Sequence, residues 1–156
     1  MHTIEDYRKF LAEVRAHTGV EALTPDDDGL VSVRVDDRFN MSLQFVPATD
    51  KVLCFVEVLQ LQADTPKEVY RDLLAGGLFG KETAGGYFAI EPDTETVVYN
   101  YFFDFAEIAG DAQTFVDTLE KILQLCDVWV ERMKAEPSRD GWEEPREEPS
   151  GNRIFA

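Results

Sequence analysis

Residues 73–90 read Leu-Leu-Ala-Gly-Gly-Leu-Phe-Gly-Lys-Glu-Thr-Ala-Gly-Gly-Tyr-Phe-Ala-Ile, a stretch that leads from the end of a helix into an aromatic strand. The start of this helix is marked by an N-cap residue, a first-turn proline and a carboxylate at the third position, which are Thr65, Pro66 and Glu68. Its end is marked by Gly76 and Gly77, because glycine accepts the positive φ that stops a helix. The sequence therefore predicts a helix of about ten residues, a tight glycine turn and a strand over residues 87–90.

Hydrophobic periodicity divides the rest of the chain into further helices and strands. Apolar residues three and four apart predict a helix between Thr3, as its cap, and Gly19, and a long final helix after Asp111. Alternating apolar residues predict strands over residues 31–35, 39–45, 52–59, 87–90 and 97–105. The strand over residues 52–59 is apolar in both registers except at Glu57, which is typical of a central strand covered on both faces. The predicted fold class is α+β, with a five-stranded, mainly antiparallel sheet and three helices in the order α-β-β-β-α-β-β-α.

Length and composition bound the number of domains. The 156 residues are 44% hydrophobic and 12% aromatic, which is enough to build the core of one domain. We expect this domain to span residues 1–135. Residues 136–156 show no periodicity, and from Pro137 onward they hold three of the seven prolines and five acidic residues. The sequence therefore predicts a disordered acidic tail there.

The acidic composition restricts the partners of the chain. It has 15 basic and 31 acidic residues, a formal charge of −16, which repels nucleic acid and anionic membranes and favours basic partners. Cys54 and Cys126 lie in apolar patterns and are predicted to be buried free thiols of a reducing cytosol. The sequence shows neither an apolar leader segment nor a run long enough to cross a membrane, so we expect a cytoplasmic protein.

The motifs that would carry catalysis or metal binding are incomplete. Gly80-Lys81 lacks the first glycine and the Ser/Thr of a phosphate loop. The acidic turn at residues 26–29 lacks the twelfth-position glutamate of a calcium loop, and His2 and His17 have no ligand spacing. Pairs of acidic residues arise by chance among 31 carboxylates. We therefore expect no catalytic residue, no cofactor and no metal.

Apolar residues exceed what three helices can cover. All five predicted strands carry an apolar face, and several are also apolar in the opposite register. Such surface usually marks contact with another chain, and an extended peptide can bind along it. The alternative, which the residues leave open, is a sheet that curls around the long last helix and buries everything.

The order of elements, the segment Leu-Phe-Gly-Lys-Glu-Thr-Ala-Gly-Gly at residues 78–86 and the acidic flanks resemble the Tir-chaperone (CesT-like) family, the class I chaperones of type III secretion. The resemblance covers residues 3–135, and Gly77 departs from it by standing where a polar residue is common. It implies a cytosolic homodimer that binds the N-terminal segment of one or a few effector proteins, keeps it competent for secretion and catalyses no reaction. A YbjN-like adaptor domain of the same fold without secretion cargo, and a small enzyme, are the alternatives.

The resemblance also assigns surfaces to elements of the chain. It implies a dimer interface on the second helix and the last two strands, with Leu73, Leu74, Leu78, Phe79, Tyr87, Phe88, Tyr99 and Tyr101. It implies an effector surface on the first helix and the first three strands, with Phe10, Val14, Val33, Val35, Met41, Leu43, Leu53 and Phe55. These two sets are the candidate functional residues of the chain.

Overall fold

The computed structural model describes residues 1–135, and the tail predicted at residues 136–156 lies outside them. The helices are α1 (Ile4–Thr18), α2 (Lys67–Gly76), α3 (Phe105–Ile108) and α4 (Ala112–Lys134). The strands are β1 (Val31–Val35), β2 (Phe39–Val46), β3 (Lys51–Gln60), β4 (Tyr87–Glu91) and β5 (Thr96–Asp104). The predicted element order is confirmed, with α3 as an additional short helix between β5 and α4.

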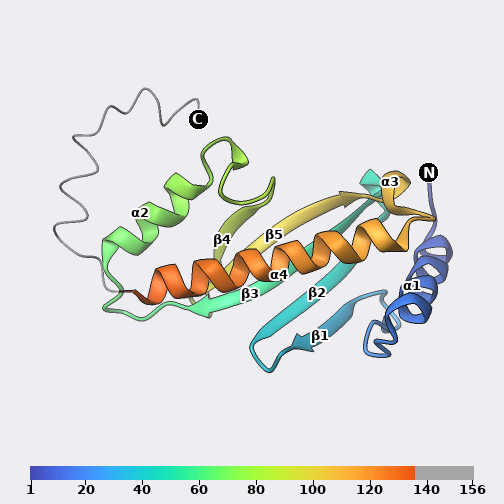
Figure 1. Ribbon diagram of the computed structural model, residues 1–156, viewed down its shortest axis with the longest axis horizontal. Coiled ribbons are helices and arrows are strands. Elements are labelled where there is room, and N and C mark those ends of the chain that lie inside the picture. Colours follow the sequence, from blue (N-terminus) through green and yellow to red (C-terminus); the bar gives the residue numbers. More distant parts are fainter. Residues whose placement is uncertain (136–156) are drawn as a thin grey trace.

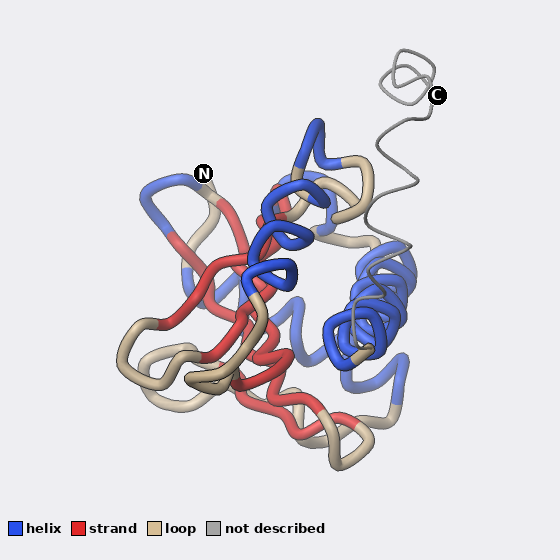
Figure 2. The backbone as a smooth tube through the Cα atoms, turned by 90° about the vertical axis from the view of Figure 1, so that its left-hand side faces the viewer, coloured by secondary structure: helices blue, strands red, loops and turns tan. Residues whose placement is uncertain are grey.

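The five strands form one antiparallel sheet in the order β1-β2-β3-β5-β4, so β1 and β4 are its edges. The register aligns inward-facing residues across strands, with Met41 of β2 opposite Val33 of β1 and Val56 of β3. In Figure 1, α4 runs across one face of the sheet, with α1 beside its N-terminal half and α2 beside its C-terminal half. Figure 2 shows α4 nearly end-on, to one side of the sheet.

The core lies between the inner face of the sheet and the helices α1 and α4. Phe10 of α1 packs edge to face on Phe105 and Phe115, with ring centroids 5.5 Å and 5.1 Å apart. Such aromatic pairs contribute about 0.5–1.5 kcal/mol beyond the burial of area. Cys54 and Cys126 are buried and free, as predicted, and burial raises the pKa of both thiols to about 12.

The predicted ends of the first and last helices are confirmed. The Thr3 hydroxyl accepts a hydrogen bond from the Asp6 backbone N–H, and the Asp6 carboxylate accepts one from the Thr3 N–H, which makes a capping box at the start of α1. Gly19 ends α1 in the left-handed region with φ 75°. Asp111 caps the start of α4 with its carboxylate. Short-range side-chain chemistry therefore fixes where these two helices begin and where α1 ends.

Two predicted details around α2 are wrong. The Thr65 hydroxyl does not cap α2; it accepts a hydrogen bond from the Gln62 N–H, and α2 begins after Pro66 without a side-chain cap. Gly77 has φ −77°, so the glycine pair does not supply the left-handed turn. That turn comes later, at Phe79, because Gly77 leads into a tight 3-10 turn before the chain reverses.

The outer face of the sheet lies away from α1 and α4. The prediction that β3 is an interior strand is confirmed by the sheet order, but its outward side chains Leu53 and Phe55 remain half-buried rather than covered. Phe102, the partner of Leu53 on β5, is exposed. The second apolar register of β3 therefore faces outward, where another chain can reach it. None of the described helices is both long and apolar enough to cross a membrane.

Candidate partner-binding surfaces

One apolar surface lies on α2 and on the connecting loop, residues 77–86, that follows it. The buried side of α2 rests on α4, so Leu74 on the other side is 81% exposed. Leu78 and Phe79 in the loop are 58% and 77% exposed, and Tyr87 at the start of edge strand β4 is 47% exposed. A group of large exposed apolar side chains marks a contact surface. We call Leu74, Leu78, Phe79 and Tyr87 the α2–β4 face, in which Tyr87 projects from the outer face of the sheet, in the same row as Asn100 and Phe55.

The α2–β4 face contains four of the eight residues predicted for dimer contact. The other four lie beneath it or beside it. Leu73 and Tyr99 are buried, while Phe88 and Tyr101 are half-buried. The Phe88 ring packs on Tyr99 and on Trp129 of α4, with centroids 5.4 Å and 5.0 Å apart. In the described chain these four residues therefore support the face from below instead of presenting themselves to a partner.

The connecting loop is held by hydrogen bonds to buried side chains. The Tyr99 hydroxyl donates to the carbonyl oxygen of Thr83 at 2.7 Å, and the Trp129 indole N–H donates to the carbonyl oxygen of Glu82 at 3.0 Å. The Thr83 hydroxyl, on a fully buried residue, donates to the carbonyl oxygen of Gly86 at 2.7 Å. The loop backbone is thus fixed to β5 and α4 at two consecutive residues and closed on itself at a third point.

Phe79 and Gly86 show how tightly this loop is shaped. Phe79 has φ 58° and ψ 12°, the left-handed conformation, which costs a non-glycine residue about 1–2 kcal/mol. At Gly86 a Cβ atom would lie 2.4 Å from both the Asn100 carbonyl oxygen and the Tyr99 hydroxyl, so only glycine fits. The Phe79 ring is therefore exposed to solvent and carried by a strained backbone. Elsewhere in the same loop, Gly86 packs closely against β5.

Two residues of α4 hold α2 and the connecting loop together. A Cβ atom at Gly76 would lie 2.4 Å from the Trp129 ring, so the glycine lets α2 rest directly on the indole. Arg132 lies over the same ring, 4.5 Å from its centroid, and forms ion pairs with Asp72 at 3.8 Å and Glu82 at 3.5 Å. Trp129 lies within the predicted final helix, and neither Thr83 nor Arg132 carried a signal by periodicity.

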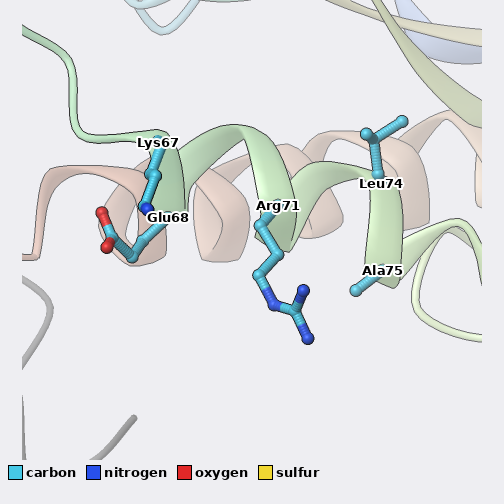
Figure 3. Close-up of a pocket in the computed structure, with 5 residues that line it drawn as sticks. All are labelled: Lys67, Glu68, Arg71, Leu74 and Ala75. Carbon is cyan, nitrogen blue, oxygen red and sulfur yellow. The ribbon is translucent and has the colours of Figure 1, made fainter.

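The charge of this region is nearly balanced. Residues 67–91 contain three basic residues, Lys67, Arg71 and Lys81, and four acidic ones, Glu68, Asp72, Glu82 and Glu91. Their sum is −1, so the other residues carry −15 of the total of −16. Figure 3 shows the open groove that runs along α2 and is lined by Lys67, Glu68, Arg71, Leu74 and Ala75. Both signs of charge therefore lie on the same helix as the exposed Leu74.

A second group of partly exposed apolar residues lies at the β1 edge of the sheet. Val33 and Val35 are on the inner face but only half-buried. Arg38, in the turn between β1 and β2, donates hydrogen bonds to Asp127 and, at 2.9 Å, to Glu131 of α4. These ion pairs tie the tip of the hairpin to α4, while β1 has β2 as its one neighbouring strand in the described sheet. We call Val33, Val35 and the outer edge of β1 the β1 margin.

The eight residues predicted for effector contact occupy three places in the structure. Four of them, Phe10, Val14, Met41 and Leu43, are buried in the core of the described chain. Val33 and Val35 belong to the β1 margin, and Leu53 and Phe55 lie half-buried on the outer face of the sheet. Only the last four side chains are open to a partner in this conformation, and they lie on two opposite faces.

The polar groups build no catalytic or metal constellation within residues 1–135. No group of three or more His, Cys, Asp or Glu residues in this range could hold a metal ion. His2 instead forms a bond of 2.9 Å to the Asp50 carboxylate, and His17 contacts the Gln113 side chain at 2.6 Å. His2 thus ties the segment before α1 to Asp50, and His17 ties α1 to α4.

Comparison with known proteins identifies the family of this chain. A sequence profile of the Tir chaperone protein (CesT) family matches residues 9–129. The chain belongs to this family. The sequence-based resemblance is thereby confirmed. A search of the curated proteins finds no match.

Solved structures share the fold of this Tir chaperone family member. A chain of the ExsC-ExsE complex gives a TM-score of 0.74 at 18% identity, covering 88% of this chain and 100% of that one. A chain of the HopA1-SchA chaperone-effector complex gives 0.69 at 20% identity, covering 82% and 95%. A chain of the Yersinia pestis type III secretion chaperone SycH in complex with a fragment of YscM2 gives 0.56 at 17% identity, covering 76% and 98%. At these identities the likeness shows the fold alone.

Proposed function

We propose that this protein is a type III secretion chaperone that acts in the cytoplasm as a homodimer. It binds the N-terminal segment of one or a few effector proteins, keeps it competent for secretion and catalyses no reaction. Membership of the Tir chaperone family and the fold shared with chaperone-effector complexes support the proposal. The observation that carries it is that large apolar side chains stay exposed at separate places, on the α2–β4 face and around the sheet.

Charge favours the α2–β4 face as the place where two copies meet. Two chains of −16 each repel one another, and residues 67–91 contribute only −1 of that charge. A two-fold axis sets the same patch of both copies face to face, so basic and acidic groups of one copy can pair with those of the other. Full burial of a leucine or phenylalanine side chain contributes about 1.5–3 kcal/mol. The exposed Leu74 and Phe79 therefore offer the largest gain on dimerisation.

The β1 margin is the effector-binding surface that we propose. The outer edge of β1 offers backbone hydrogen bonds to an extended segment, and Val33 and Val35 offer apolar contact beside it. The charge outside residues 67–91, −15, attracts effector segments that carry basic residues. Leu53 and Phe55 provide a further contact on the outer face.

Light scattering on the purified chain tests the dimer. We expect a dimer mass at micromolar concentration and a monomer or aggregate after Leu74→Asp or Phe79→Asp, because a charge in an apolar contact is left desolvated. Asp substitution of Ala16, exposed on α1, is the control and should leave the dimer intact. A monomer mass for the unmodified chain would contradict the proposed dimer.

Capture of a candidate effector tests the chaperone function. The bait is the N-terminal segment of a secreted protein encoded beside this chain, and circular dichroism checks that each variant is folded. Val33→Asp should weaken capture, whereas Val128→Asp, which adds the same charge at an exposed valine of α4 outside the proposed surfaces, should not. If no secreted protein from the locus is captured by the unmodified dimer, the adaptor function without cargo becomes the better proposal.

A further inference from the structure

We propose that Thr83, Tyr99 and Trp129 are positioning residues of the dimer, which hold the connecting loop so that Phe79 is displayed before the second copy arrives. This inference rests on the proposed homodimer and adds the residues that set its affinity. None of the three belongs to the exposed α2–β4 face, since Tyr99 and Thr83 are fully buried and Trp129 is 1% exposed.

The loop needs such support because its internal hydrogen bonds do not join it to the rest of the chain. Its backbone makes internal hydrogen bonds from Gly80 to Gly77, from Lys81 to Leu78, from Gly85 to Gly80 and from Gly86 to Thr83. Its large side chains, Leu78 and Phe79, point to solvent instead of anchoring it. An exposed aromatic ring gains free energy by folding back onto nearby apolar surface, and a left-handed non-glycine residue gains by relaxing. Contacts from outside the loop must therefore hold the observed conformation.

Two of the ties come from buried residues outside the loop, and the third, from the Thr83 hydroxyl to the Gly86 carbonyl oxygen, closes the loop on itself. Tyr99 lies on the central region of β5, paired with Val56 of β3 and Phe88 of β4, and its hydroxyl reaches the Thr83 carbonyl. Trp129 is packed between α2 and Phe88 and reaches the carbonyl of Glu82. A loop ordered in this way does not lose further conformational entropy when the partner binds, which strengthens binding without adding a contact.

The chain supplies a matched control for Tyr99. Tyr7 of α1 is also fully buried, and its hydroxyl has no hydrogen-bond partner within residues 1–135. Tyr99→Phe and Tyr7→Phe therefore remove the same oxygen atom from two buried tyrosines, and only the first change releases the connecting loop. Thr83→Val is a second, nearly isosteric change that removes the hydroxyl bonded to Gly86.

Sedimentation equilibrium of the full chain measures the dimer dissociation constant for each variant. One hydrogen bond of ordinary strength corresponds to roughly a two- to twelvefold change in an equilibrium constant, and a dimer contains each bond twice. We expect Tyr99→Phe and Thr83→Val each to raise the dissociation constant about fivefold or more. Tyr7→Phe should leave it within about twofold. Phe79→Asn, which accepts the left-handed backbone but removes the ring, should abolish the dimer.

Hydrogen exchange distinguishes positioning of the loop from general loss of stability. In dilute samples, where the chain is monomeric, residues 77–86 should exchange faster in Tyr99→Phe and Thr83→Val, while β3 and α4 keep their protection. Unchanged dissociation constants for both variants, or an equal rise for Tyr7→Phe, would overturn this inference and leave the dimer standing. A monomeric unmodified chain would overturn the dimer and this inference together.

Discussion

The two halves of α4 are fixed by different chemistry. In the N-terminal half Phe115 is fully buried and packs on Phe10 and Phe103, with centroids 5.1 Å and 4.8 Å apart. In the C-terminal half one indole and one guanidinium, those of Trp129 and Arg132, hold α2 and the connecting loop through single hydrogen bonds and ion pairs. Both halves bury apolar side chains, but the second half also fixes one surface through a few directional bonds.

The largest effect is expected in the first half, at Phe115. Truncation of a fully buried phenylalanine removes its transfer free energy and leaves a cavity, so Phe115→Ala should lower the free energy of unfolding by about 3–5 kcal/mol. Urea titration followed by circular dichroism measures the change. Val128→Ala on the same helix, where the side chain is 64% exposed, should stay within about 0.5 kcal/mol. Similar losses for both would contradict the distinction between a packed and an open side of α4.

The next largest loss of stability is expected at the contact between α2 and the C-terminal half of α4. Gly76→Ala places a Cβ atom against the Trp129 ring, and overpacking of this kind costs about 1–3 kcal/mol, of which better helix propensity offsets up to about 1 kcal/mol. Gly77→Ala is the matched control, because its nearest neighbour would be the Leu74 carbonyl oxygen at 3.5 Å. Thermal unfolding and Trp fluorescence record both variants. An equal response would show that α2 can move off the indole freely.

A smaller, pH-dependent effect is expected at Asp50, which lies between β2 and β3 and holds the start of the chain. Asp50 accepts hydrogen bonds from the His2 ring and backbone N–H, and these bonds hold the pKa of the carboxyl below its usual value. A carboxyl with a lowered folded-state pKa stabilises the fold above its unfolded-state pKa of about 3.9, and this contribution disappears as the pH falls through the folded-state value. Asp50→Asn should therefore lower the urea midpoint at pH 7, and the difference from the unmodified chain should shrink below pH 4. A difference that is constant down to pH 2 would rule out the titration of Asp50 as its cause.

The smallest change in the free energy of unfolding is expected for the tail that follows α4. Residues 137–156 offer little apolar area by composition, so a chain that ends at Glu136 should unfold within about 1 kcal/mol of the full chain. Matched urea titrations of the two chains measure the difference. A loss of several kcal/mol would show that Trp142 or Phe155 packs on the folded body, and that the second half of α4 has a further partner.

The local signals predicted the caps of α1 and the start of α4, although the equally local cap and glycine stop predicted for α2 were wrong. The capping box at Thr3, the glycine stop at Gly19 and the cap at Asp111 each depend on residues within one helical turn. The ties of the connecting loop depend instead on pairs separated by 16 residues, as in Tyr99 with Thr83, or by 47, as in Trp129 with Glu82. Hydrophobic periodicity carries no signal for pairs so far apart in the sequence, so these hydrogen bonds can be identified only in the folded structure.

Periodicity also could not tell which apolar side chains the chain covers by itself. Leu73 and Leu74 are adjacent and chemically identical, yet a turn of about 100° along the helix separates a buried residue from an exposed one. Phe10 and Val14 form an apolar stripe that suits a partner as well as a core, and α4 covers it. The family resemblance assigned the interface to α2, β4 and β5, but which residues of these elements are exposed follows only from the packing of α4.

The two thiols between the sheet and α4 can report when this layer opens. Cys54 lies on β3 and Cys126 on α4, and they are the two cysteines of the whole chain. Because burial raises both pKa values to about 12, neither is a reactive thiolate while the layer is closed. A thiol reagent therefore labels either sulfur only when this layer opens, and we expect a motion that lifts α4 from the sheet to uncover both. Mass spectrometry of the unmodified chain should show molecules with two labels or none. The rate at which the doubly labelled form accumulates measures how often the layer between α4 and the sheet opens.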